Sequence, residues 1–143
     1  MICALLMSAI CVTPASAAFI IECQTTVYGS KELPHPIQWK WDGVELRTSY
    51  KHVNPEIVFE LAPVHFQERV IDRDGLASHG LKATLYTFVM SVERNGDRMS
   101  RSFMVMEANS KVSLLESSGF VSEAGGLLSV KETTYRDCTW QKL

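Results

Sequence analysis

One stretch of the chain, residues 84–107, restricts the fold more than any other. Asn95-Gly96 lies near its middle, and this dipeptide readily takes positive φ at both central positions of a two-residue type I′ turn. On both sides of it, apolar and polar residues alternate with the period of two that is typical of β-strands. The stretch therefore predicts a β-hairpin.

This hairpin also has a predicted register. Pairing outward from Asn95-Gly96 gives one nearly apolar face, which contains the pairs Val92–Met99, Met90–Arg101, Phe88–Phe103 and Tyr86–Val105. The other face contains the pairs Glu93–Arg98, Ser91–Ser100 and Val89–Ser102. A slip by one residue would exchange the two faces. We therefore expect the first face, including Arg101, to point into a core.

A second hairpin is predicted over residues 37–48, around Asp42-Gly43. Its inner pairs are Trp41–Val44, Trp39–Leu46 and Ile37–Thr48, and its outer pairs are Lys40–Glu45 and Gln38–Arg47. The opposite charges again fall on the polar face, where they stabilise the pairing. Two hairpins of the same construction favour an all-β protein.

Further strands are expected on either side of these hairpins. They cover 19–28, 57–61, 64–71, 111–116 and 127–143, and the loops between them include 29–36, 72–80 and 117–126. In the last strand the alternation fails, because Glu132 and Arg136 share the parity of Cys138. A bulge or turn near Arg136-Asp137 would restore it. The prediction is an all-β, antiparallel meander of seven to nine strands closed into a small barrel, which leaves no free edge. A β-sandwich is the alternative.

The first 17 residues predict a secretory signal peptide. An uncharged apolar run is followed by Pro14 and then by Ala15-Ser16-Ala17, which are small residues where a signal peptidase reads them. No Lys or Arg follows Met1, so an upstream start or an unusual first strand are the alternatives. Removal of residues 1–17 would leave 18–143 as a single β-barrel domain, either periplasmic or secreted.

The charge pattern indicates which partners to expect. All charged residues lie beyond residue 17, and their formal net charge is −2 with the signs finely mixed. No basic stripe points to nucleic acid. The apolar run at the start is shorter than the ~20 residues that a membrane span needs. We therefore expect neither nucleic acid nor a membrane-spanning segment.

Two cysteines, Cys23 and Cys138, remain once Cys3 and Cys11 leave with the signal. In an oxidising compartment they predict a disulfide. Closing so long a loop stabilises a fold by roughly 4–5 kcal/mol in the chain-entropy model. The bond would place the first and last strands side by side, which favours closure of the sheet. Two buried thiols are the alternative.

Metal sites and catalytic groups have little support in the sequence. None of the four histidines, His35, His52, His65 and His79, lies within four residues of another, whereas zinc sites usually show a local ligand pair. Asp72-Arg73-Asp74-Gly75 begins like a calcium loop but lacks the remaining ligands. The chain has no Gly-x-Ser-x-Gly motif. We expect no metal, no cofactor and no catalytic residue.

The most informative candidate site is the apolar face itself. Trp39, Phe88 and Phe103 would line it, with Arg101 pointing among them. A buried cation needs a partner, which could be Glu132, Glu68 or a ligand anion. The alternatives are that Arg101 reaches water at the rim and that the aromatic residues are simply core.

These features predict a non-catalytic binding protein for a small apolar or anionic ligand. The alternative is a protein-interaction module, such as an inhibitor of a hydrolase, acting through loops 29–36, 72–80 and 117–126. The ligand hypothesis requires a cavity of at least about 300 Å³. The interaction hypothesis requires an exposed apolar patch. An enzyme has the least support.

Overall fold

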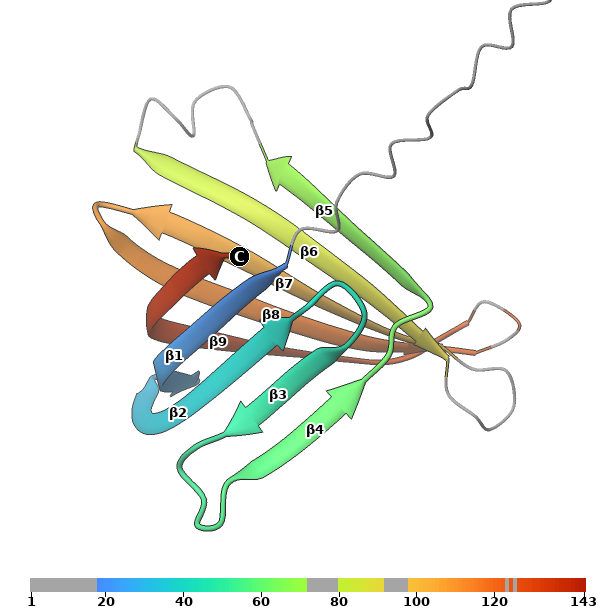
Figure 1. Cartoon of the computed structure of the whole chain (residues 1–143), viewed down its shortest axis with the longest axis horizontal. Coiled ribbons are helices and arrows are strands. Elements are labelled where there is room, and N and C mark those ends of the chain that lie inside the picture. Colours follow the sequence, from blue (N-terminus) through green and yellow to red (C-terminus); the bar gives the residue numbers. More distant parts are fainter. Residues whose placement is uncertain (1–17, 72–79, 92–97, 123, 125) are drawn as a thin grey trace, which may run out of the picture.

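The fold was taken from a computed structural model, which describes residues 18–71, 80–91, 98–122, 124 and 126–143. Nine β-strands make up its regular structure (Figure 1): β1 Phe19–Tyr28, β2 Lys31–Trp41, β3 Leu46–Tyr50, β4 Ile57–Leu61, β5 His65–Ile71, β6 Leu81–Ser91, β7 Arg98–Ala108, β8 Lys111–Val121 and β9 Leu127–Lys142. In this described part of the chain, no helix is long and apolar enough to cross a bilayer. The proposed signal peptide lies outside the described residues.

All nine strands belong to one antiparallel sheet, whose order is β4-β3-β2-β1-β9-β8-β7-β6-β5. Strands that follow each other in the chain are neighbours in the sheet, except that β1 pairs with β9 and that β4 and β5 are not paired. The predicted all-β antiparallel arrangement is therefore confirmed. Closure into a barrel is not, because β4 and β5 form the two edges of the sheet. The sandwich is not seen either, since the strands form a single sheet.

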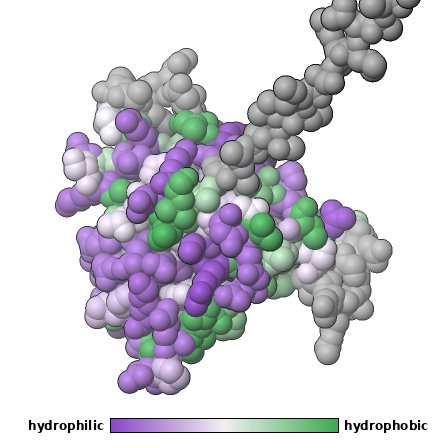
Figure 2. All heavy atoms as spheres, in the orientation of Figure 1, coloured by the Kyte–Doolittle hydropathy of each residue, from purple (hydrophilic) through white to green (hydrophobic). Residues whose placement is uncertain are grey.

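The sheet curls until its two halves face each other (Figure 1). Aromatic rings from distant strands meet inside it: Phe19 of β1 stacks on Tyr86 of β6 with centroids 4.1 Å apart, and Trp41 of β2 lies 4.9 Å from Phe66 of β5. Burying this apolar face is the main force that drives the curling. On the face seen in Figure 2 the outer surface is largely hydrophilic, and its hydrophobic side chains form separate patches.

Both predicted hairpins form, but each register is wrong by two residues. In β6–β7, Met90 lies opposite Met99 and Phe88 opposite Arg101, and Ser91–Arg98 is the last pair among the described residues. A shift of two residues keeps every side chain on its predicted face, because side chains alternate with a period of two. The inner and outer faces are therefore as expected. The proposed turn at residues 95–96 lies outside the described residues.

In the second hairpin, the structure of the turn explains why the observed register differs from the predicted one. Trp41 pairs with Leu46 and not with Val44, so residues 42–45 form the loop. Asp42 Oδ1 accepts hydrogen bonds from the backbone N–H groups of Val44 and Glu45, both at 2.8 Å, and Gly43 takes φ +100°. The Asp side chain thus acts as the acceptor that closes a wider turn. Val44 is exposed, where an inner position had been predicted.

Cys23 and Cys138 form the predicted disulfide and lie directly opposite each other in the β1–β9 ladder. The predicted irregularity in the last strand is also present. Asp137 has φ +54°, and β9 carries one extra residue opposite the Val112–Leu114 stretch of β8. This bulge turns Tyr135 into the core. Two predicted loops, 29–36 and 117–126, are too long, because residues 31–36 belong to β2 and residues 117–121 to β8.

Candidate functional site

Arg101 lies on the inner face of β7, as predicted, and makes contacts that the sequence did not reveal. Its Nε donates to Glu116 Oε1 of β8 at 2.5 Å, and its Nη1 donates to Thr48 Oγ1 of β3 at 3.2 Å. The guanidinium also lies 5.3 Å from the centroid of the Phe103 ring. Thr48 and Arg101 are brought together because the curled sheet places β3 across from β7.

Glu116 joins this arginine to a buried tyrosine. The Tyr135 hydroxyl donates to Glu116 Oε2 at 2.9 Å. Burial raises the pKa of the Tyr135 phenol far above its usual value, and the adjacent carboxylate raises it further. The side chains of Arg101 and Glu116 are each only 12% exposed, so each charge is compensated by its neighbour. The predicted partners of Arg101, Glu132 and Glu68, are therefore wrong.

A partly open cavity of about 210 Å³ adjoins this cluster. It is lined by Tyr50, Met99, Arg101, Glu116, Ser118, Lys131, Thr133 and Tyr135. Its charged groups are two cations and one carboxylate, and hydroxyl groups supply most of its other polar atoms. Lys131 makes no ion pair with any described residue. The cavity is smaller than the roughly 300 Å³ that the ligand hypothesis called for.

Of the four residues predicted to bind a ligand, only Arg101 lines this cavity. Trp39, Phe88 and Phe103 are fully buried. The Phe103 ring contacts both of the others, with centroids 5.6 Å from Trp39 and 5.8 Å from Phe88. The structure therefore brings these three together as packed core. A role for them in binding stays a prediction.

Sequence reasoning missed Glu116 and Tyr135, although both left a signal. Glu116 follows Val112 and Leu114 at a spacing of two, and this parity places it on the inner face. Tyr135 acquires its inner position only through the bulge at Asp137, which reverses the parity of the residues before it. The signal for Tyr135 was thus the failed alternation in the last strand.

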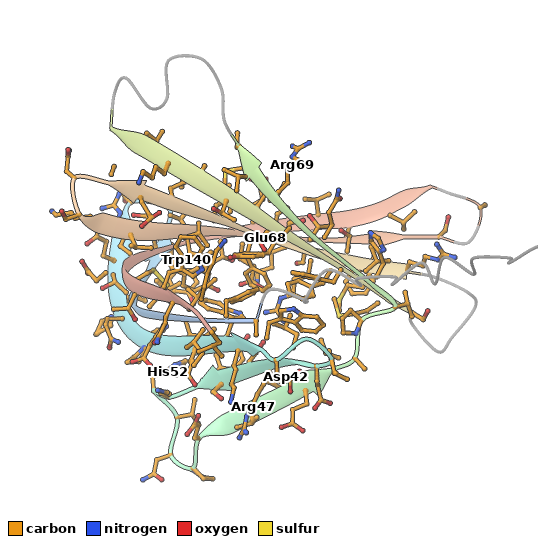
Figure 3. All side chains as sticks on the ribbon, turned by 45° about the horizontal axis from the view of Figure 1, so that its top comes forward. Asp42, Arg47, His52, Glu68, Arg69 and Trp140 are labelled. Atoms are coloured by element: carbon orange, nitrogen blue, oxygen red, sulfur yellow. A yellow bond between two sulfur atoms is a disulfide. The ribbon has the colours of Figure 1, made fainter. Side chains whose placement is uncertain are left out.

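A second ion pair lies on the inner face, away from the cavity. Glu68 of β5 accepts from Lys142 Nζ of β9 at 2.6 Å, and that ammonium lies 5.5 Å from the centroid of the Trp140 ring. Figure 3 shows Glu68 close to Trp140. Glu68 therefore lies on the apolar side, as the alternation predicted, and is neutralised there.

The sequence suggested that the histidines are scattered, but two of them lie together in the structure. The rings of His35 and His52 stack with centroids 4.3 Å apart. Within the described part of the chain, no group of three or more His, Cys, Asp or Glu side chains is placed to hold a metal ion. The calcium-like segment 72–75 and His79 lie outside the described residues.

Comparison of the chain with protein-family models, with curated proteins and with solved structures found no match. The described part of the chain is thus a nine-stranded antiparallel β protein that has a polar, charged cavity at Arg101 beside its aromatic core.

Proposed function

We propose that this chain is an exported, non-catalytic binding protein that holds a small anionic ligand in the Arg101 cavity. The observation that carries the proposal is the lining, which sets Arg101 and Lys131 against a single carboxylate, Glu116. An excess of positive charge in a recess attracts anions. Arg101 is already engaged by Glu116, so Lys131 is the cation available for a direct contact.

The size and polarity of the cavity favour an anionic ligand over an apolar one. The aromatic residues that an apolar ligand would contact are packed against one another in the core. The cavity instead offers the hydroxyls of Tyr50, Ser118 and Thr133. Its 210 Å³ suit a ligand smaller than a drug-sized molecule.

Export to the periplasm or the medium is part of the proposal. The signal-like composition of residues 1–17 supports it. The Cys23–Cys138 disulfide is compatible with it, because such bonds persist in oxidising compartments.

The test is a two-dimensional NMR titration of the protein with acetate, citrate and inorganic phosphate as probes. We expect at least one anion to shift the amide signals of Ser118 and Thr133, and its affinity to fall at least fivefold in Lys131→Met. Lys40→Met is the matched control, because Lys40 is an exposed lysine on the outer face of β2. Unshifted cavity signals with all three anions, or equal affinity in the two variants, would contradict the proposal.

The open edges of the sheet favour a second candidate function, a protein-interaction module such as a hydrolase inhibitor. On β4, Ile57 and Phe59 point to the inner side and are 42% and 54% exposed, and Val70 of β5 is 64% exposed. Edge strands with unpaired backbone groups accept a strand from a partner. Mass spectrometry of proteins that co-purify from the native envelope tests this. Phe59→Asp should lose the partner, whereas Val44→Asp, at an exposed turn, should keep it.

A further inference from the structure

His35 and His52 are 17 positions apart in the sequence but lie side by side in the structure. His35 belongs to β2, and His52 lies two residues beyond the end of β3. The β2–β3 ladder pairs Ile37 with Tyr50, and continuing that register by two residues sets His35 opposite His52. Residues directly opposite each other on one face have Cβ atoms about 5 Å apart. The pair is therefore a consequence of strand register.

Backbone contacts hold the two histidines side by side. The Lys51 N–H donates to the Pro36 carbonyl at 2.9 Å, which ties the residue before His52 to the residue after His35. The two imidazoles stack with centroids 4.3 Å apart and an angle of 9° between their planes. Tyr28 packs edge-on to His35 at 5.9 Å, and Tyr50 packs edge-on to His52 at 6.1 Å.

The chemistry of this pair is that of metal ligands. Uncharged imidazole is the commonest metal-binding side chain in proteins. Neither ring is in a salt bridge with another described residue, and the nearby Lys51 ammonium is held by Glu22 at 3.0 Å.

To share one ion, the two rings must turn out of their stacked arrangement. Imidazole nitrogens lie about 2.0–2.1 Å from a bound first-row metal, so two of them on one ion are separated by up to about 4 Å. In the stacked arrangement the ring centroids are 4.3 Å apart, and the lone pairs, which lie in the ring planes, run parallel to each other and not toward one ion. His52 is exposed and lies just beyond the end of β3 (Figure 3), and His35 is half-buried, so a rotation about each Cβ–Cγ bond can turn both lone pairs toward one ion.

We propose that His35 and His52 form a site for a divalent transition-metal ion that prefers imidazole, with Cu²⁺ bound most tightly. The preference for Cu²⁺ follows from the general order of affinities among first-row divalent ions at nitrogen ligands. In the described part of the chain no third His, Cys, Asp or Glu is placed to join them, so water completes the coordination. Tyr50 lines the Arg101 cavity and packs against His52, so the two sites adjoin, but neither histidine lines that cavity and the proposal does not depend on the function proposed for it.

The test is a calorimetric titration of the full chain with CuCl₂, combined with electron paramagnetic resonance of the loaded protein. We expect one equivalent of Cu²⁺ with a spectrum showing two imidazole nitrogens. His35→Asn and His52→Asn should each weaken binding at least tenfold. His65→Asn is the matched control, because His65 is an exposed histidine on β5, and it should leave the affinity unchanged.

Two results would overturn the proposal. One is unchanged Cu²⁺ affinity in both His35→Asn and His52→Asn, and the other is a spectrum with amine but no imidazole nitrogen, which would place the ion at the chain terminus. A Zn²⁺ titration followed by NMR is a diamagnetic check, in which the ring signals of His35 and His52 must shift together. Thermal unfolding of each variant shows that it is folded before its affinity is compared.

Discussion

At the scale of single residues, the Arg101–Glu116 ion pair is the most consequential contact. Both side chains are 12% exposed, so removing one charge leaves the other largely desolvated. We expect Glu116→Gln to lower the free energy of unfolding by roughly 2–4 kcal/mol, because an unpaired buried charge is costly. Urea denaturation measures this. Glu60→Gln, which breaks the exposed contact with Arg47, should change stability by less than about 1 kcal/mol. Equal effects in the two variants would contradict the prediction.

Tyr135 makes the stability of the folded protein depend on pH in the alkaline range. Its pKa is raised in the folded protein by burial and then by the Glu116 carboxylate, so the folded state keeps the phenol protonated when the unfolded chain ionises. The stabilisation is therefore complete below the usual tyrosine pKa of about 10 and is lost as pH rises above it. Compared with Tyr135→Phe, the wild-type protein should lose more stability between pH 9 and pH 11, as measured by chemical denaturation at each pH. Parallel pH profiles would show that the phenol is not coupled to folding.

The sequence predicts an inward arginine that needs an anionic partner, and this much of the site is correct. It does not predict Glu116, because Glu132 shares the parity of Cys138 and looked better placed. The bulge at Asp137 reverses that parity and brings Thr133 and Tyr135 to the inner face instead. Pairings such as Glu68 with Lys142, which are 74 residues apart, arise from how far the sheet curls and leave no local signal.

At the scale of elements, the inner and outer faces of the strands are predictable, whereas registers depend on details of the turns. Gly43 takes φ +100° in the 42–45 loop. Residues with a Cβ atom rarely adopt this backbone conformation. Gly43→Ala should therefore destabilise the protein by roughly 1–2 kcal/mol, as measured by thermal denaturation. Val44→Ala, at a neighbouring exposed position, should stay within about 0.5 kcal/mol. A neutral Gly43→Ala variant would indicate that the loop changes shape at no cost.

At the scale of the whole molecule, the disulfide fastens β1 to β9, the only strand pair that joins the two ends of the described chain. The double variant Cys23→Ala, Cys138→Ala should have an unfolding free energy lower by about 2–5 kcal/mol. Without the bond, the unfolded chain regains the conformational entropy that closing a loop between residues 115 positions apart had removed. Denaturation of the wild-type protein with and without a reducing agent should reproduce the difference. A double variant as stable as the parent would show that the strand pairing alone fixes the ends.

The pairing of β1 with β9 has a further consequence for how the chain can be rearranged. Leu143 N–H donates to the Ala18 carbonyl at 2.9 Å, so a short linker can join these two residues. Breaking the chain at Pro63, between the unpaired strands β4 and β5, would then cut no ladder. The resulting circular permutant would run from β5 to β9 and on through β1 to β4, so its order in the chain would match its order across the sheet. Because each contact between neighbouring strands would then be local, this permutant should refold faster than the natural sequence.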